Sequence, residues 1–594
     1  MLGFGSSAKL HILSISIDFC APPKKPAQFS KEFLNARSGG IPNASAPQRI
    51  RFAGPDPFLS SLRYDHSVVQ PFDSLVLYNS FTKSEEPFEA LQEGIVKMYT
   101  CGPTVYGRPH IGNYSSFLMA DLLRRWLEAL GYEVHHVKNI TDVGHLLHDR
   151  DQGDDKVQKE AEKEKVHPLE IARRYTELFL EDEKALNILE PLARPKATET
   201  IPEMVSIIRE LLERGHAYET DDGIYFSVET FPKYGKLSGN TLDNLNAGSR
   251  IEVNEQKKHP ADFALWKKTI GPNNHHILRW GFATGRISES RGEDPTSGFP
   301  GWHIECSAMA KRILGDQLDI HTGGEDNIFP HHECEIAQSE CSGPSPFVRF
   351  WLHKRRIDMG AEKMSKSIGN VLHLPDIVAK GFSPLDLRYY FLSVHYRTQL
   401  KFSWKGMEDA RKARRKIMEW IGEIEILRAK SEIRNLKSET NAKFPNSDFS
   451  LVSDFILRAS DLPGELFYFA NRFIEAMNSD LNTPAALAAV FDGMSWSRKI
   501  SETINHQPST INQSHQPTDL MKFVNIIRAT FGCFEPDTRE GEADIPSEVK
   551  KLVDERAQAR ELKDFAASDR LRDAIRANGF EVRDSDGGQE IRRM

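Results

Sequence analysis

The sequence predicts an α/β protein: a domain with a parallel sheet that carries an insertion, followed by an α-helical bundle and a small C-terminal domain. Two observations lead to this fold class. Near residues 93–143 a strand, a helix and a second strand follow one another, an order that requires parallel pairing and a right-handed crossover. Beyond about residue 410, apolar residues recur at helical spacing instead. With 594 residues, the chain is long enough for several hydrophobic cores.

The first unit is visible in three consecutive stretches. EGIVKMYTCGPTVYG (93–107) has the pattern of a strand that runs into a Gly/Pro turn, and YEVHHVKNITDV (132–143) that of a second strand. Between them, SSFLMADLLRRWLEALG (115–131) predicts an amphipathic helix capped by its final glycine. Its apolar positions share one face: Leu118, Leu122, Leu123, Trp126, Leu127 and Leu130.

The parallel pattern is interrupted and then resumes. After about residue 188, the hairpin-like GIYFSV and polar loops indicate an inserted module, and the strand pattern returns with LDIHTGGEDN (318–327). In the helical part, RRKIMEWIGEIEIL places Ile417, Trp420, Ile421, Ile424 and Leu427 on one face. A last helix, SDRLRDAIRANG (568–579), precedes a short hairpin. The expected divisions are 1–74 (extension), 75–344 (sheet domain) with its insertion at about 188–295, 345–411 (connecting region), 412–510 (bundle) and 511–594 (C-terminal region).

Residues 1–74 differ in composition from the rest of the chain. They are rich in Ser, Ala and Pro, poor in acids and slightly basic. We interpret them as a disordered extension or as the product of a start codon placed too far upstream, and a targeting peptide is the alternative.

Overall composition excludes several classes of protein. Hydrophobic residues make up 39% and charged residues 27%, which argues against wholesale disorder, and the net charge of −8 argues against a nonspecific polycation. No run approaches the roughly 20 apolar residues of a membrane-spanning helix. The six scattered cysteines form no disulfide framework, so we expect a reducing compartment, the cytoplasm.

A first motif lies between the first strand and its helix, in RPHIGNY (108–114). His110 to Asn113 then occupy a helix N-terminus, where free backbone N–H groups and the helix dipole favour phosphate. Gly112 lets a flat ligand approach the backbone closely. Four residues of this kind also occur by chance.

A second motif, EKMSKSIGN (362–370), places Lys363 and Lys366 on either side of Ser365 before a Gly-Asn turn. A mobile loop with two ammonium groups can close on a nucleotide and neutralise the charge of its polyphosphate. The alternative is a solvated lysine loop.

A third group of residues has the chemistry of a metal site. His331 and Glu335, four residues apart in PHHECE, share one face of a helix that starts near Pro330. Cys101 ends the first strand, at the edge where open α/β sheets bind ligands, and Cys306 lies just before a helical stretch. Two cysteines, one histidine and one glutamate suit Zn²⁺, one ion per chain. Cys334 is a competing ligand, whereas His332 points about 100° away from His331.

HIGN and KMSKS together resemble the paired HIGH and KMSKS motifs of class I aminoacyl-tRNA synthetases. This resemblance implies a Rossmann-type ATP site, activation of an amino acid as its adenylate, and transfer to the 3′ end of a tRNA. His110, Lys363 and Lys366 would be catalytic, and Mg²⁺ would accompany ATP. Asn113, in place of the second histidine, can donate a hydrogen bond but carries no charge. The implied ATP contacts are His110, Gly112, Asn113, Lys363, Ser365 and Lys366.

Within class I, the sequence resembles cysteinyl-tRNA synthetase from about residue 75 to the C-terminus. Four further segments carry this resemblance: MYTCGPTVYG, GWHIECSAM, GGEDNIFPHHECEIAQS and ADFALWK. It implies that zinc on Cys101, Cys306, His331 and Glu335 binds the thiolate of substrate L-cysteine, and that tRNA(Cys) is the acceptor. Gly102, Thr141 and Trp302 would line the amino-acid pocket, although each could also be an ordinary core residue.

The C-terminal region resembles the anticodon-binding end of the same family. Arginine can stack on bases or contact phosphate, although a solvated helix surface accounts for most of such residues. Ile591 stands where many family members have tryptophan, and the stretch 269–300 also departs from the family. The arginines of this region are Arg556, Arg560, Arg570, Arg572, Arg576, Arg583, Arg592 and Arg593.

Two other functions compete with a monomeric synthetase. A cysteine:sugar-amine ligase of the mycothiol-synthesis type shares the zinc and ATP motifs, but it has no use for a long helical C-terminal region. A catalytically silent RNA-binding relative would have no physical reason to keep KMSKS, His110 and four metal ligands.

Overall fold

The computed structural model describes residues 74–143, 146, 155–240, 242, 256–287, 296–359, 371–435, 462, 464–506, 517–535, 547–561, 564–578, 580–585 and 588–593. The extension, apart from residue 74, lies outside these ranges. So does the lysine motif with Lys363, Ser365 and Lys366. The domain limits expected from the sequence stay predictions.

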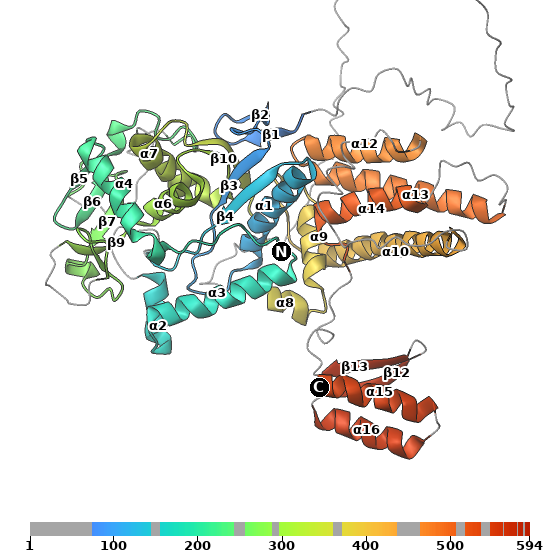
Figure 1. Cartoon of the computed structure of the whole chain (residues 1–594). Helices are drawn as coiled ribbons and strands as arrows, with labels where there is room; N and C mark the ends of the chain where they lie inside the picture. Colours follow the sequence, from blue (N-terminus) through green and yellow to red (C-terminus); the bar gives the residue numbers. More distant parts are fainter. Residues whose placement is uncertain are drawn as a thin grey trace, which may run out of the picture. The chain divides into compact units, whose positions relative to one another are not determined.

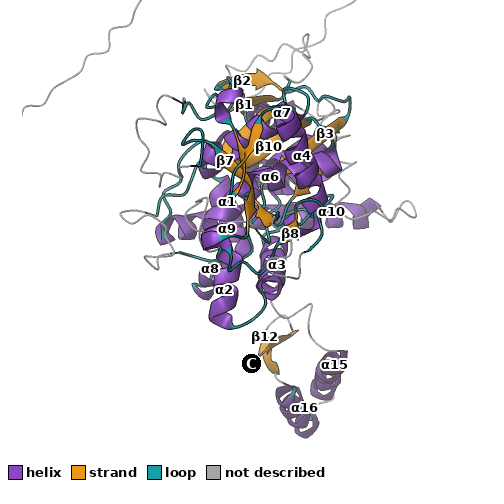
Figure 2. Ribbon diagram, turned by 90° about the vertical axis from the view of Figure 1, so that its left-hand side faces the viewer, coloured by secondary structure: helices purple, strands orange, loops and turns teal. Residues whose placement is uncertain are grey.

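A four-stranded parallel sheet lies at the centre of the fold, in the order β11-β10-β3-β4 (Figure 1). Helix α1 (Ile111–Ala129) connects β3 to β4, so the predicted βαβ unit and the α/β class are confirmed. Helices α1 and α6 (Trp302–Leu314) both pack against this sheet (Figure 2). The strands are β3 (Ile95–Thr100), β4 (Glu133–Lys138), β10 (Leu318–Gly324) and β11 (Val348–Lys354).

Helix α1 begins at Ile111 with His110 as its N-cap, which confirms that His110 to Asn113 lie at a helix N-terminus, four residues before the apolar pattern that starts at residue 115. The backbone N–H of Asn113 donates to Nδ1 of His110, and the N–H of His110 donates to the side-chain oxygen of Asn113 (3.2 and 3.0 Å). This reciprocal cap satisfies two N–H groups at the helix start. The predicted apolar face of the helix is buried in the main core, except for Leu130 at its end, which packs against this core half-buried.

The insertion contains a second sheet of five antiparallel strands, in the order β5-β6-β7-β9-β8. Only one hairpin was expected there. Helix α4 (Ile201–Glu213) packs against α6 and against α7 (Glu333–Ser342) of the sheet domain. The strands are β5 (Ala217–Glu219), β6 (Gly223–Phe226), β7 (Phe263–Lys268), β8 (Trp280–Gly281) and β9 (Ser297–Pro300).

The helical part follows the predicted pattern with one exception. Ile417, Trp420, Ile421 and Ile424 are buried, but Leu427 is 37% exposed near the outer end of its helix. None of the helices in the described ranges is long and apolar enough to cross a membrane. The helices are α2 (Lys156–Glu164), α3 (Pro168–Ala185), α8 (Leu374–Ala379), α9 (Pro384–Leu392), α10 (Trp404–Asn435), α12 (Gly464–Asn478), α13 (Thr483–His506) and α14 (Pro517–Phe531).

Two smaller units complete the described chain. A hairpin of β1 (Val76–Asn79) and β2 (Ser84–Pro87) precedes the main sheet. The C-terminal unit has its own small core of Val549, Val553, Ile575, Phe580 and Val582. As predicted, its last helix is followed by a hairpin. Its elements are α15 (Ser547–Glu561), α16 (Phe565–Ala577), β12 (Phe580–Ser585) and β13 (Gly588–Arg593).

A buried ionic cluster links α1 to the helical part, and we call it the arginine joint. The guanidinium of Arg388, on α9, donates to Asp121 of α1 (2.5 Å), to the carbonyl of Asn187 after α3 (2.9 Å) and to the carbonyl of Phe531 at the end of α14 (2.6 Å). Arg125 also pairs with Asp121 (2.7 Å). One arginine thus satisfies carbonyl groups at two helix ends, where intrahelical partners are lacking.

Candidate functional site

Four metal-binding side chains meet at the carboxyl edge of the parallel sheet. Cys101 directly follows β3, and Cys306 lies in the second turn of α6. Glu335 is on α7, and His331 lies in the kinked segment Ile328–His332 before it. Phe329 is extended (φ −140°, ψ 133°) and helical backbone resumes after it, so the helical turn begins near Pro330 as expected. All four side chains are buried together.

The distances fit a tetrahedral zinc shell. The four donor atoms lie within 4.8 Å of one another. The two sulfur atoms are 3.9 Å apart, Cys101 Sγ is 3.7 Å from Glu335 Oε1, and His331 Nε2 is 3.0 Å from the same oxygen. Tetrahedral zinc, with Zn–S bonds of about 2.3 Å, would separate two sulfur ligands by about 3.8 Å. The donor types and their separations both suit this metal.

The site also favours charged ligands. The hydrogen bond from the Cys101 thiol, together with nearby His331, lowers the pKa of Cys306 to about 6, so this thiol ionises readily. Burial raises the pKa of Glu335, but His321 and His331 outweigh it and lower the value to about 2. A thiolate and a carboxylate in a buried site favour a cation.

A second possible donor group shares two members with the first. It consists of Cys101, His321, His332 and Glu335, again within 4.8 Å. His332 lies about 100° around the helix from His331, and its ring bonds locally: Nδ1 is 2.7 Å from His353 Nε2, and Nε2 is 3.3 Å from Cys101 Sγ. The competing ligand Cys334 belongs to neither group, and its sulfur contacts the hydroxyl of Tyr234 at 3.5 Å.

Two histidines, buried His321 and half-buried His303, hold the two ligands of α7 and its preceding segment. His321 Nε2 lies 3.0 Å from the second oxygen of Glu335, and His303 Nδ1 lies 3.0 Å from Nδ1 of His331. The ring of Trp302 stacks on His331 at 4.3 Å between centroids. Such partners fix the orientation of a ligand and tune its basicity.

The proposed pocket residues Gly102 and Thr141 lie where β3 and β4 end. The N–H of Gly102 donates to the side chain of Asn139 (2.7 Å), which in turn donates to the hydroxyl of Thr141 (3.1 Å). A Cβ on Gly102 would lie 1.7 Å from the carbonyl oxygen of Asn139, so only glycine allows this approach. Buried Thr141 is also bonded through its own N–H to the carbonyl of Pro103 (3.0 Å).

The N-terminus of α1, with His110, Gly112 and Asn113, lies at the same sheet edge. The segment that follows the lysine motif returns here, because the N–H of Ile111 donates to the carbonyl of Leu372 (2.9 Å) and His373 Nδ1 donates to the carbonyl of Pro109 (3.0 Å). The lysine motif itself is not described, so its distance to His110 stays a prediction.

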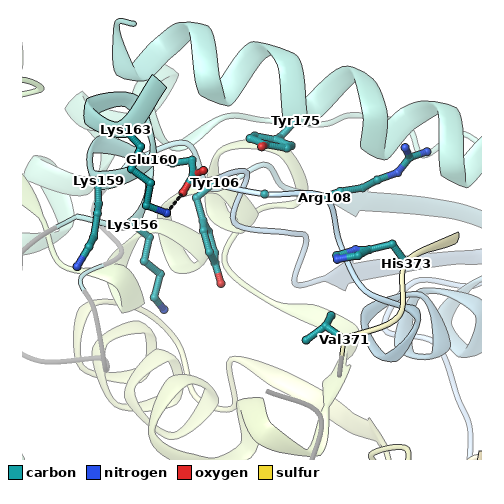
Figure 3. A pocket seen from close by; sticks show the side chains of 10 residues that line it. Tyr106, Arg108, Lys156, Lys159, Glu160, Lys163, Tyr175, Val371 and His373 are labelled. Carbon is teal, nitrogen blue, oxygen red and sulfur yellow. Dashed lines mark hydrogen bonds and ion pairs between the residues drawn. The ribbon is translucent and has the colours of Figure 1, made fainter. Parts of the chain in front are cut away.

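Beside this segment lies a cavity of about 610 Å³, which we call the α2 cavity (Figure 3). Its walls come from the turn after β3, from α2, from α3 and from residues 371–373. Tyr106, Lys156, Lys159, Lys163 and Tyr175 are among the residues that line it.

Some site residues escaped the sequence analysis. His321 lies inside a strand and Asn139 follows one, where the pattern indicates only sheet structure. A polar residue within an otherwise buried strand was the available signal, since buried polar groups need partners.

In the C-terminal unit, Arg556 is buried, whereas Arg560, Arg570, Arg572 and Arg576 are exposed. The side chains of the remaining arginines there are not described.

Comparison with protein families identifies the chain's relatives. Residues 87–412 match the tRNA synthetases class I (C) catalytic domain. Residues 472–526 match a DALR domain, and residues 542–592 match the cysteinyl-tRNA ligase anticodon binding domain. The cysteine–tRNA ligase of Chlorobium luteolum is 38% identical over 86% of this chain and 98% of its own length. The chain belongs to the cysteine–tRNA ligase family. The family member from Thermus thermophilus is also 38% identical, over 87% of this chain and 99% of its own.

A solved structure supports the fold of this family member independently. The LeuRS of Agrobacterium radiobacter, in a ternary complex with tRNA and LeuAMS, aligns with a TM-score of 0.51 over 76% of this chain and 85% of that one. At 11% identity, the likeness concerns the class I fold alone.

Proposed function

We propose that this protein activates L-cysteine with ATP and transfers it to the 3′ end of tRNA(Cys). Its family membership and the buried group of two cysteines, one histidine and one glutamate support this proposal. The group is the observation that points to cysteine among the amino acids, because soft metals and their thiolate ligands select sulfur.

The first step joins the amino acid to the nucleotide. A carboxylate oxygen of cysteine attacks the α-phosphorus of ATP, the bond from this phosphorus to the bridging oxygen breaks, and pyrophosphate leaves. His110 at the N-terminus of α1 and the ammonium groups of Lys363 and Lys366 would hold the phosphates and offset their charge. Gly112, Asn113 and Ser365 would complete the ATP contacts, and Mg²⁺ would accompany the nucleotide.

The second step moves the aminoacyl group to RNA. A terminal ribose hydroxyl attacks the carbonyl carbon of the adenylate, and AMP leaves with its phosphate. Neither step needs a covalent bond to the protein, so catalysis rests on positioning and electrostatics.

Selection of the substrate would occur at the four buried ligands. A pocket that reads size separates cysteine from serine weakly, because the side chains differ by one atom. Zinc held by Cys101, Cys306, His331 and Glu335 would prefer the substrate sulfur to a hydroxyl and favour its thiolate. Gly102, Thr141 and Trp302 would form the walls that orient the amino acid beside this point.

The exposed arginines of the C-terminal unit would contact the anticodon end of the tRNA. A ligase for a small sugar amine has no role for the anticodon-binding region matched at 542–592. We further propose that the protein acts as a monomer in the cytoplasm, where its buried thiols stay reduced; Cys101, Cys306, Cys334, Cys341 and Cys533 form no disulfide.

The test is amino-acid-dependent exchange of labelled pyrophosphate into ATP, with cysteine and serine compared before and after zinc removal. We expect exchange with cysteine alone and its loss on chelation. If exchange with cysteine persisted after the loss of zinc had been confirmed, the metal would not be what selects the substrate. No exchange in the zinc-loaded protein would favour the silent RNA-binding alternative.

A further inference from the structure

The buried histidines at the carboxyl edge of the parallel sheet form a second donor group that the proposed activity does not use. The four donor atoms of each group lie within 4.8 Å of one another, and all of these side chains are buried. We call Cys101, Cys306, His331 and Glu335 the cysteine-rich group, and Cys101, His321, His332 and Glu335 the histidine-rich group.

The distances in the histidine-rich group fit a divalent metal. His332 Nε2 is 3.3 Å from Cys101 Sγ. His321 Nε2 is 3.0 Å from Oε2 of Glu335, and His332 Nε2 is 4.0 Å from Oε1 of this carboxylate. Tetrahedral zinc would separate a sulfur from a nitrogen ligand by about 3.5 Å and a nitrogen from an oxygen ligand by about 3.3 Å. A metal would take the place of the protons that join these pairs, because metal ligands are deprotonated.

The ring of His332 is held in the orientation that a metal ligand needs. Its Nδ1 lies 2.7 Å from Nε2 of His353, which is also buried. When Nδ1 donates to His353, the lone pair of Nε2 faces Cys101. Metal-binding histidines almost always donate through their other nitrogen in this way, because such a partner fixes the tautomer. A Cβ on Gly323 would lie 2.7 Å from Cε1 of His332, so the glycine leaves room for the ring.

The second imidazole, that of His321 on β10, is fixed by aromatic neighbours. Its ring stacks on Trp351 at 4.6 Å between centroids and meets the edge of Tyr99 at 5.1 Å. These contacts leave Nε2 directed at Glu335.

Glu335 can serve both groups at once because its two oxygens face different histidines. Oε1 is 3.0 Å from His331 Nε2, whereas Oε2 is 3.0 Å from His321 Nε2. Each oxygen would therefore bind one ion. The sulfur of Cys101 lies between Cys306 Sγ (3.9 Å) and His332 Nε2 (3.3 Å), so this thiolate would bridge the two ions. Paired metal sites in enzymes are built with ions about 3.5–4 Å apart.

We propose that the histidine-rich group binds a second divalent cation beside the first, with Cys101 and Glu335 shared between the two ions. One sulfur, two imidazoles and one carboxylate suit a metal of borderline softness, such as Zn²⁺ or Co²⁺. Because the first ion already draws charge from the shared ligands, the second binds more weakly and enters when metal is in excess. Metal content is measured without substrates, so this site does not depend on the proposed function.

The experiment adds Co²⁺ to protein that already holds one Zn²⁺ per chain. The parent protein should take up one further ion and develop an absorption band from charge transfer between the Cys101 thiolate and cobalt, while elemental analysis shows that the zinc stays bound. His332→Gln should bind the added ion at least about 100-fold more weakly and keep its zinc. His321→Gln should also lose the added ion, so a folding failure in one variant leaves the other to decide.

The control is His136→Gln. This change removes another buried imidazole of the same sheet, which contacts Thr100 (2.9 Å) and belongs to neither group, so the variant should bind cobalt like the parent.

Cys306→Ser provides the reciprocal test, because it removes a ligand of the cysteine-rich group alone. The metal-stripped variant should still bind one Co²⁺ with a charge-transfer band. Cys306→Ser/His332→Gln should bind none in the same concentration range.

Three results would overturn the inference. If the parent never held more than one ion per chain, the two groups would be alternative positions for a single metal. Release of zinc as cobalt enters would show exchange at one site. A second ion without the charge-transfer band, or one bound equally by the parent, His332→Gln and His321→Gln, would lie elsewhere on the protein.

Discussion

Replacing Gly102 by alanine should damage the site without touching any ligand. An alanine Cβ would lie 1.7 Å from the carbonyl oxygen of Asn139, while ordinary contact begins at 3.4 Å, so the two backbones must separate by about 1.7 Å. They cannot do so freely, because Val105 donates to the carbonyl of Thr141 (3.1 Å) and Thr141 to the carbonyl of Pro103 (3.0 Å). The shift therefore reaches Cys101, the residue before the substitution.

The expected magnitude follows from the size of this shift. Overpacking of this kind costs about 1–3 kcal/mol in the free energy of unfolding, and a displacement near 1 Å can cost about 100-fold in rate. We expect kcat/KM for cysteine in pyrophosphate exchange to fall by about 100-fold, with a smaller loss in thermal stability.

Gly422→Ala provides the matched control. Gly422 lies in α10 with nothing within 4 Å of the added Cβ, so alanine should leave exchange unchanged and stabilise the helix by up to about 1 kcal/mol. If Gly102→Ala catalysed pyrophosphate exchange at the rate of the parent protein, the reasoning would be refuted. The strand ends would then separate without disturbing the site.

Three other predictions concern the metal, the nucleotide and pH. Cys306→Ser should lower zinc affinity by at least about 100-fold in a chelator competition, whereas the control Cys334→Ser should keep the parental affinity. Equal zinc affinities in the two variants would exclude Cys306 as a ligand. Lys366→Ala should reduce adenylate formation by about 100-fold with little change in tRNA affinity, and full-rate activation would remove this lysine from the chemistry. Burial lowers the pKa of His353 to about 3. Between pH 6.5 and 3 the unfolded chain therefore binds a proton at this histidine and the folded chain does not. The free energy of unfolding should fall as the pH drops through this range. In metal-stripped protein, denaturant titrations should show that the free energy of unfolding decreases less between pH 7 and pH 5 in His353→Gln than in the parent. An equal decrease would mean that other groups cause the acid sensitivity.

The sequence predicted the parts of the site that depend on residue type and on the sheet edge. Cys101 follows a strand, and parallel strands end together, so its meeting with residues of other segments was predictable. The position of the α1 N-terminus at His110 to Asn113 was predictable from its place between strand and helix, although the cap itself uses a histidine, which is not among the usual capping residues. His321 was missed because its role depends on a carboxylate fourteen residues away on another element.

The arginine joint limits how this chain can be divided. Arg388 satisfies the carbonyl groups of Asn187 after α3 and of Phe531 in α14 and the carboxylate of Asp121 at once, and Arg388, Phe531 and Asp121 are buried. A fragment that ended before α14 would leave an arginine in an apolar surface without one of its acceptors, at a cost of several kcal/mol. The catalytic part is therefore not a detachable module. Recombination or truncation between the class I domain and the helical bundle should yield poorly folded chains, whereas a cut before the C-terminal unit, which has its own core, spares the joint.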